Sequence, residues 1–445
     1  MQNLSDRKKY LNVIQQLEKR FNFEKKENVN FPFFKLERTK SLMDLIGNPH
    51  KNNSYTIHVA GTNGKGSVCS NIESIFNVAN IKTGMLTSPH LLEYTERIRI
   101  NGENITHSEF IEAHDFIIQN IKKYENINNI SFTFFEVLTA MAFYLFKKNK
   151  VKIQIIETGL GGTFDSTNIV DSDLSIITAI GLDHQSVLGE SIELIAENKA
   201  GIIKAESKTI TTMQRNSVMK IIQDKAESVN TTLIKIFYEY IEPLTFHDNY
   251  LSTVIKIKNK IYKIKLNSIG LNQINNITTA ITAINEYPFL KLSTSQIEEG
   301  IKNNNWPCRG EIIKKYDRYF FIDGAHNEES IKNLAGTINK FFKTANFFIL
   351  GINTGHDIAS AKLLLKNAKK IILSQSAHPK SLTAKKLGKI ICSISKLEPI
   401  NSDNIPDAIK KAVFHSKKND IIICTGSLFL ASEIKENLRN EFEKL

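Results

Sequence analysis

Residues 58–67 read His58-Val59-Ala60-Gly61-Thr62-Asn63-Gly64-Lys65-Gly66-Ser67 and separate an apolar run at 55–60 from a helix-like pattern at 68–80. The apolar run predicts a buried strand. A glycine-rich turn between strand and helix lets backbone N–H groups approach phosphate oxygens, while the helix N-terminus and a lysine add positive potential. The common phosphate loop is Gly-x-x-x-x-Gly-Lys-Ser/Thr. Here Val59 takes the first glycine position and Gly66 separates Lys65 from Ser67, so the stretch predicts a variant nucleotide-phosphate site.

The composition is typical of a soluble globular protein. Its 445 residues allow two or three domains with ample core. Hydrophobic residues make up 41% and charged residues 23%, close to the globular average. No apolar run reaches the roughly 20 residues of a membrane span, and the polar N-terminus lacks a secretory signal. The four cysteines lie far apart and offer neither zinc spacing nor a disulfide framework. We expect a cytoplasmic protein that has no membrane partner.

The net charge of +12, from 58 basic and 46 acidic residues, allows either nucleic acid or an anionic small molecule as the partner. The lysines are scattered among isoleucine and asparagine, and no nucleic-acid-binding module is recognisable. We therefore expect small-molecule substrates and no nucleic acid.

The order of the elements predicts an α/β fold in two parts. Residues 1–54 predict a helix and then irregular structure with an aromatic loop at 31–34. Short apolar strands then alternate with helices, which predicts a parallel sheet covered on both faces. An antiparallel hairpin and two helices follow, and a second, smaller alternation begins after residue 300. The strands are expected at 55–60, 153–157, 174–180, 209–212, 252–257, 261–266, 319–323, 347–350, 370–374 and 420–425. We predict a P-loop parallel-sheet ATPase-type domain with a small antiparallel hairpin (1–300) and a smaller Rossmann-like C-terminal domain (301–445).

Several side chains that could bind a ligand or take part in catalysis follow the predicted strands. Glu157 and His184 lie at strand ends, where ligands bind in an open parallel sheet. A carboxylate there can hold a metal beside phosphates, although it can also simply cap the strand. Asp323 can hold a ribose hydroxyl or cap the next helix. Taken alone, Ser88 would be a turn serine and Arg309 a surface arginine.

Together, these segments resemble the Mur ligase superfamily and, within it, the folylpolyglutamate synthase/dihydrofolate synthase family. The resemblance runs from Leu36 to Leu428, and the ordered set of motifs is highly specific. The matching segments are 58–67, 83–90, 96–102, 132–136, 159–168, 183–184, 199–204, Gln273 with Asn276, 306–309, 323–327 and 426–428.

The resemblance implies an ATP-dependent amide ligase that joins L-glutamate to dihydropteroate, to folates or to both through an acyl phosphate, and that acts as a monomer. Its cofactors would be ATP and Mg²⁺. The catalytic residues implied are Lys65, Lys199 and His326. The ATP-binding residues implied are Thr62, Asn63, Gly64, Lys65, Gly66, Ser67, Asn276, Arg309 and Asp323. Magnesium would be held by Ser88, Glu157 and His184.

By the same resemblance, Lys199 aligns with a lysine that is carbamylated in this family. Residues Leu36, Glu37, Arg38, Phe134, Phe135, Phe164 and Asp165 match regions that line the pterin site. Stacking aromatics with one carboxylate suit a flat, hydrogen-bonding heterocycle. The competing interpretation is that these phenylalanines are ordinary core residues. The sequence also departs from the family pattern: Thr163 and Lys380 stand where arginine is usual, Asn198 where glutamate is usual, Asn272 where an aromatic or histidine is usual, and residues 355–357 differ from an expected Lys-Asp.

Two rival hypotheses remain at this point. One is a nucleotide-binding regulatory or nucleic-acid-binding module with a degenerate site. The other is a Mur ligase acting on peptidoglycan precursors, against which the paired Phe134-Phe135 and the 159–168 segment argue by resemblance only.

Overall fold

The computed structural model describes residues 2–22, 35–342, 347–355, 358–366, 368–395 and 397–439. The chain forms two compact units. The first comprises residues 1–237 and 276–300, and the second comprises 238–275 and 301–445. This grouping differs from the predicted 1–300 and 301–445 by the segment 238–275. The aromatic run predicted as a loop at 31–34 lies outside the described residues.

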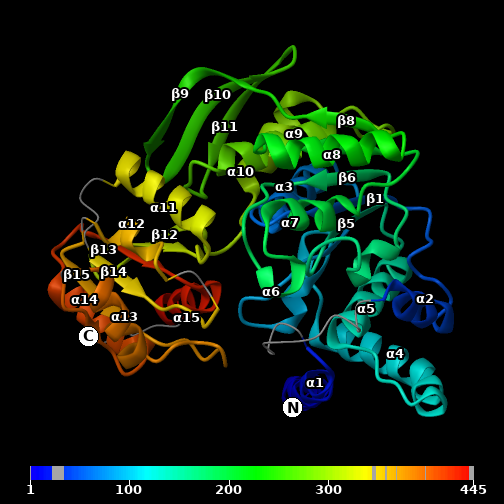
Figure 1. Cartoon of the computed structure of the whole chain (residues 1–445), viewed down its shortest axis with the longest axis horizontal. Helices are drawn as coiled ribbons and strands as arrows, with labels where there is room; N and C mark the ends of the chain where they lie inside the picture. The colour runs from blue at the N-terminus through cyan, green and yellow to red at the C-terminus, as the bar shows by residue number, and fades with distance from the viewer. Residues whose placement is uncertain are drawn as a thin grey trace. The chain divides into compact units, whose positions relative to one another are not determined.

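The first unit is built on an eight-stranded sheet in the order β4-β3-β2-β5-β1-β6-β7-β8. Strands β1, β5, β6 and β8 of this sheet are labelled in Figure 1. The six strands from β2 to β8 are parallel, and β3 and β4 extend one edge antiparallel. The bounds are β1 Tyr55–Ala60, β2 Thr83–Leu86, β3 Ile98–Ile100, β4 Glu103–Asn104, β5 Ile153–Glu157, β6 Leu174–Ile177, β7 Lys208–Thr211 and β8 Thr232–Lys235.

Helices cover the sheet because its central strands are apolar along their whole length. Every residue of β1, β5 and β6 is buried, which is expected of parallel strands with helices on both faces. One core joins β2, β3 and β5 to α1, α2, α4 and α5, and another joins β1 and β6 to α7 and α8. The helices are α1 Gln2–Lys19, α2 Leu36–Leu45, α3 Lys65–Val78, α4 His107–Asn128, α5 Phe134–Lys148, α6 Gln185–Leu188, α7 Ile192–Ala200 and α8 Asn216–Ser228. The chain continues through α9 Gln273–Asn285 and α10 Thr294–Asn303.

The second unit contains two sheets. A three-stranded antiparallel sheet comprises β9 Glu239–His247, β10 Tyr250–Ile257 and β11 Lys260–Leu266. A six-stranded sheet has the order β12-β13-β17-β14-β15-β16, parallel except for β12. Its strands are β12 Arg309–Lys315, β13 Arg318–Asp323, β14 Phe347–Leu350, β15 Lys370–Leu373, β16 Ile400–Asn401 and β17 Ile421–Thr425. Its helices are α11 Glu328–Phe341, α12 Ala361–Leu365, α13 Ala384–Ile394, α14 Ile405–His415 and α15 Leu428–Arg439.

The predicted α/β class and the hairpin are confirmed, with three local differences. Helix α3 begins at Lys65 and not at Val68, so Gly66 and Ser67 lie in its first turn. Strand β6 ends at Ile177 and not at residue 180, because the next residues pair with the phosphate loop: the N–H groups of Thr62 and Asn63 donate to the Ala179 carbonyl. Within the described residues, the strands additional to those predicted are β2, β3, β4, β8, β9, β12 and β16. Of these, β9 and β12 each pair antiparallel with a neighbour and are partly exposed, so they lack the continuous apolar run of a buried strand. Within the described ranges, no helix is long and apolar enough to cross a membrane.

Candidate active site

Four neighbouring parallel strands bring most of the predicted phosphate and metal residues of the first unit to one edge of the sheet. Strands β2, β5, β1 and β6 are adjacent, and each ends at this edge. Ser88 follows β2, Glu157 ends β5, the phosphate loop follows β1, and His184 lies beyond β6. Segments that are distant in the sequence, such as the phosphate loop and His184, therefore meet at the carboxyl ends of the strands, which is where open α/β sheets bind ligands.

The phosphate loop takes a backbone conformation that only glycine tolerates at two positions. Gly61 has φ +150° and Gly64 has φ +92°. A Cβ on Gly61 would lie 1.9 Å from the Thr178 hydroxyl oxygen, and one on Gly64 would lie 2.4 Å from Asn276 Oδ1. Asn276, on α9, therefore lies directly against the loop. Lys65 follows as the first residue of α3, so the loop opens onto a helix N-terminus that favours anions.

Two lysine ammonium groups meet at one backbone carbonyl of this loop. Lys65 Nζ lies 3.2 Å from the Gly61 oxygen, and Lys199 Nζ donates to the same oxygen at 2.9 Å. Lys65 Nζ also lies 3.8 Å from the Glu157 carboxylate. Lys199 comes from α7 and is buried. Burial lowers its pKa to about 7, the Lys65 charge acts in the same direction, and Asp183, Asp165 and Glu157 oppose it.

Ser88 and Glu157 lie together, whereas His184 is more exposed. The Ser88 N–H donates to Glu157 Oε2 at 3.3 Å, and Glu157 is buried. The His184 side chain is 60% exposed and lies 3.8 Å from Asp183. In the described part of the chain, no three His, Cys, Asp or Glu side chains cluster as a metal site. The donor chemistry still fits magnesium, because the Glu157 carboxylate and the Ser88 hydroxyl are oxygen ligands and nucleotide phosphates usually supply others.

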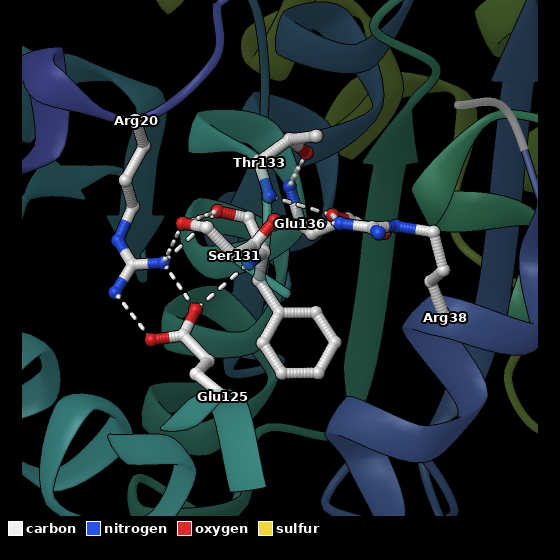
Figure 2. A network of polar contacts seen from close by, with 7 residues as sticks. Arg20, Arg38, Glu125, Ser131, Thr133 and Glu136 are labelled. Carbon is white, nitrogen blue, oxygen red and sulfur yellow. Dashed lines mark hydrogen bonds and ion pairs between the residues drawn. The ribbon is translucent and has the colours of Figure 1, made fainter. Parts of the chain in front are cut away.

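Two of the predicted pterin residues, Arg38 and Asp165, are hydrogen-bonded to other groups of the same chain. Arg38 donates from Nε and Nη2 to both oxygens of Glu136, at 3.1 and 3.2 Å, and from Nη2 to the Ser131 carbonyl (Figure 2). Asp165 is buried and accepts from the N–H groups of Leu160 and Thr167. Burial raises the pKa of Asp165, and those hydrogen bonds oppose the shift. Both side chains therefore hold neighbouring backbone groups in place in this structure.

The other predicted pterin residues differ in exposure. Phe134 is fully buried in the core, and the Arg97 guanidinium lies 5.2 Å from its ring centre. Phe135 packs against Gly159, where a Cβ would lie 2.5 Å from its ring. Phe164 is 45% exposed. Leu36 is partly exposed and Glu37 is exposed at the start of α2.

The second unit holds the remaining predicted residues on neighbouring elements. Arg309 and Asp323 are register partners across β12 and β13. Burial raises the pKa of Asp323 to about 6, while Arg309 and the N–H groups of Ala325 and Gly310 lower it. His326 precedes the Asn327 cap of α11, and its Nδ1 lies 2.8 Å from the Gly324 carbonyl. The Lys380 backbone carbonyl accepts a hydrogen bond from the Thr354 N–H.

Sequence reasoning missed two contributors to this site. The Gly61 carbonyl, which accepts from both lysines, leaves no side-chain signature. Thr163 and Asn198 were noted as departures, but their direct hydrogen bonds to one another could not be inferred from positions 35 residues apart. Only the Thr163 hydroxyl, a possible donor, hinted at it, because the acceptor is the Asn198 backbone carbonyl.

A glycine-rich phosphate loop, a lysine at the N-terminus of the following helix and a carboxylate at the next strand end define a nucleotide-dependent enzyme. The Mur ligase middle domain matches residues 59–284, and the Mur ligase glutamate ligase domain matches residues 308–428. A dihydrofolate synthase/folylpolyglutamate synthase of Bacillus subtilis is 32% identical over 418 residues, covering 91% of this chain and 95% of the relative.

Two solved structures are also similar. A folylpolyglutamate synthase from Thermotoga maritima has 27% identity and a TM-score of 0.81, with 97% of each chain covered. The Mycobacterium tuberculosis enzyme, solved with ADP and AMPPCP, has 24% identity and a TM-score of 0.88, with 98% of this chain and 99% of that chain covered; at this identity the likeness is one of fold. The chain belongs to the Mur ligase family and, within it, to the dihydrofolate synthase/folylpolyglutamate synthase group. Members of this family are ATP-dependent ligases that form amide bonds, so the predicted enzyme class is confirmed.

Proposed function

We propose that this protein ligates L-glutamate to dihydropteroate, to folates or to both, with conversion of ATP to ADP and phosphate. One observation carries the proposal: Lys65 and Lys199 meet at the Gly61 carbonyl, with Glu157 3.8 Å from Lys65. This cluster of charge at a phosphate loop suits transfer of a phosphoryl group. The 32% identity to a dihydrofolate synthase/folylpolyglutamate synthase supports the choice of substrates.

The proposed reaction has two steps. A carboxylate oxygen of the folate substrate attacks the γ-phosphorus of ATP, and the bond to the β–γ bridging oxygen breaks, which releases ADP and forms an acyl phosphate. The amino nitrogen of L-glutamate then attacks the acyl carbon and loses a proton as phosphate leaves. Residues 62–67 would bind the phosphates through backbone N–H groups, and the Lys65 ammonium would neutralise the charge that develops on the transferring oxygens.

Magnesium would be held by Ser88 and Glu157, with His184 as the third expected residue. Bound there, the ion would supply Lewis-acid stabilisation of the phosphoryl oxygens. The Ser88 N–H that donates to Glu157 fixes the carboxylate beside Lys65. Replacing Glu157 with Gln should therefore raise the magnesium concentration needed for half-maximal activity.

Lys199 is proposed to carry a carbamate. Carbamylation requires a neutral amine, whose nitrogen attacks the carbon of CO₂ and then loses a proton. An ordinary lysine is almost fully protonated at neutral pH, but burial lowers the pKa of Lys199 to about 7 and leaves a large neutral fraction. The observed contact of Nζ with the Gly61 carbonyl would then belong to the unmodified amine.

The remaining assignments follow the same proposal. Asn276, which lies beside Gly64, would bind ATP, as would Arg309 and Asp323, with His326 as a further catalytic residue. The pterin would contact the segments carrying Leu36, Phe135 and Phe164. Arg38, Asp165 and the buried Phe134 would affect pterin binding indirectly, by positioning the backbone around them. The protein is proposed to be a cytoplasmic monomer.

A substrate panel tests the proposal. Purified protein with ATP, Mg²⁺ and L-glutamate is assayed for ADP release with dihydropteroate, tetrahydrofolate or a muropeptide precursor as acceptor. Glutamate-dependent ADP release with either folate compound is expected, and their ratio distinguishes the two synthase activities. Turnover with the muropeptide alone, or no turnover with any acceptor, would contradict the proposal. Salt-sensitive oligonucleotide binding stronger than folate binding would favour the regulatory alternative.

A further inference from the structure

A turn at residues 161–163 is hydrogen-bonded to the last turn of helix α7. Asn198 Oδ1 accepts from the Gly162 N–H at 2.9 Å. The Asn198 carbonyl accepts from both the N–H and the hydroxyl of Thr163, at 2.8 and 2.9 Å. Three hydrogen bonds thus join the segment that follows β5 to the residue immediately before Lys199.

The two backbones are packed so closely that no side chain fits between them. A Cβ on Gly161 would lie 2.3 Å from Asn198 Oδ1, and one on Gly162 would lie 2.9 Å from the Lys199 Cα. A Cβ on Gly201 would lie 1.9 Å from the Thr163 hydroxyl oxygen. The glycines therefore permit an approach that Asn198 and Thr163 fix with directional hydrogen bonds.

This contact bears on Lys199 because a lysine side chain has many rotamers and its reach depends on where its Cα lies. Lys199 extends from α7 to the Gly61 carbonyl after β1, and it is buried along the way. The Lys199 backbone contacts Gly162, and Gly162 belongs to the segment that follows Glu157. The contact therefore ties the position of Lys199 to the sheet edge that carries Glu157.

We propose that Asn198 and Thr163 are positioning residues. The Asn198 side chain accepts from the Gly162 N–H and the Thr163 hydroxyl donates to the Asn198 carbonyl, and these bonds hold the Lys199 backbone so that its Nζ reaches the Gly61 carbonyl beside Lys65. The placement of Lys199 is a structural claim, and only its kinetic consequence rests on the proposed function. Neither residue needs to touch a substrate.

The test measures the accessibility of Lys199 directly. Each variant is labelled with acetic anhydride at pH 10, where even an exposed lysine, with a pKa of about 10.4, has a reactive neutral fraction of about a third. Peptide mass spectrometry compares Lys199 with Lys220, whose side chain is 76% exposed. Asn198→Ala is expected to raise the relative labelling of Lys199 about fivefold, the factor that corresponds to the loss of one hydrogen bond. Thr163→Val also removes one of the three hydrogen bonds, the one from its hydroxyl to the Asn198 carbonyl, and should raise the labelling by a similar factor.

Conservative variants and a distant control sharpen this test. Asn198→Asp and Thr163→Ser keep an acceptor and a hydroxyl, so Lys199 should stay protected in both. Asn149→Ala removes a comparable side-chain bond, to the Leu145 carbonyl at 3.1 Å, and should leave the labelling unchanged. Wild-type labelling of Lys199 in folded Asn198→Ala would overturn the proposal, even if the variant melts at a lower temperature.

Kinetics gives a second readout. Misplacing Lys199 should lower kcat by roughly 10- to 100-fold, while the KM for ATP changes less than about threefold, because the phosphate loop is untouched. An Asn198→Ala variant with raised Lys199 labelling and the kcat of the wild type would overturn the kinetic consequence, namely that the position of Lys199 sets the rate of ligation. If the wild-type protein has no ligase activity, the proposed function fails, but the labelling still decides whether Asn198 and Thr163 position Lys199.

Discussion

Lys65 and Lys199 share one hydrogen-bond acceptor, the Gly61 carbonyl, at 3.2 and 2.9 Å. Lys65 reaches it from the first turn of α3, and Lys199 reaches it from α7. Two ammonium groups this close repel one another, and the more buried one more readily loses its proton. Burial, and after it the Lys65 charge, therefore lower the pKa of Lys199 to about 7.

Lys65→Ala should lower turnover by at least about 10³-fold while leaving the fold intact, because it removes the cation nearest the phosphate loop. The measurement is ADP release, with circular dichroism to check the fold. Lys82→Ala, at an exposed lysine outside the site, serves as the control. Undiminished turnover in Lys65→Ala would remove this lysine from the mechanism.

Lys199 should make the stability of the unmodified protein depend on pH. Its pKa is about 7 in the folded state and about 10.4 in an unfolded chain. Between these values the unfolded state binds more protons, so the free energy of unfolding rises with pH. In CO₂-free buffer, urea titrations from pH 6 to 10 should show Lys199→Met more stable than wild type at pH 7. That advantage should shrink as the pH approaches 10, and parallel curves would contradict the assignment.

Asp323→Asn should change stability in a different pH window. The pKa of Asp323 is raised from 3.8 to about 6 in the folded protein, so the native state binds the extra proton between these values. The stability that Asp323 contributes is complete below pH 4 and is lost as the pH rises through 6. The unfolding free energy of Asp323→Asn relative to wild type should therefore increase from pH 4 to 6 and then level off. A difference independent of pH would show that Asp323 titrates normally.

Arg38→Met should destabilise the protein by about 2–3 kcal/mol, because it leaves the buried Glu136 carboxylate unpaired. The Arg38 and Glu136 side chains are 19% and 5% exposed. Adding Glu136→Gln should recover part of the loss, since the unpaired charge is then gone. Urea denaturation measures the stability. A direct pterin contact by Arg38 would instead raise the KM for folate and leave the stability unchanged.

Local patterns were enough to predict much of this protein. The apolar runs at 55–60 and 153–157 predicted β1 and β5, because a strand buried on both faces must be apolar throughout. Strand β6 was predicted three residues too long, because Ala179 accepts hydrogen bonds from Thr62 and Asn63. Because that pairing joins residues more than a hundred positions apart, the hydropathy of the local sequence does not predict it.

The sequence by itself determined the fold class, the phosphate loop and the family, because each depends on residue types at fixed short spacings. Only the tertiary structure decided which side chains meet. It joined Lys65 to Lys199 at Gly61, Thr163 to Asn198, and Arg38 to Glu136. The physical reason is that strand order brings distant segments to one edge, and hydrogen-bond geometry then selects partners within about 3 Å. No local spacing encodes that selection.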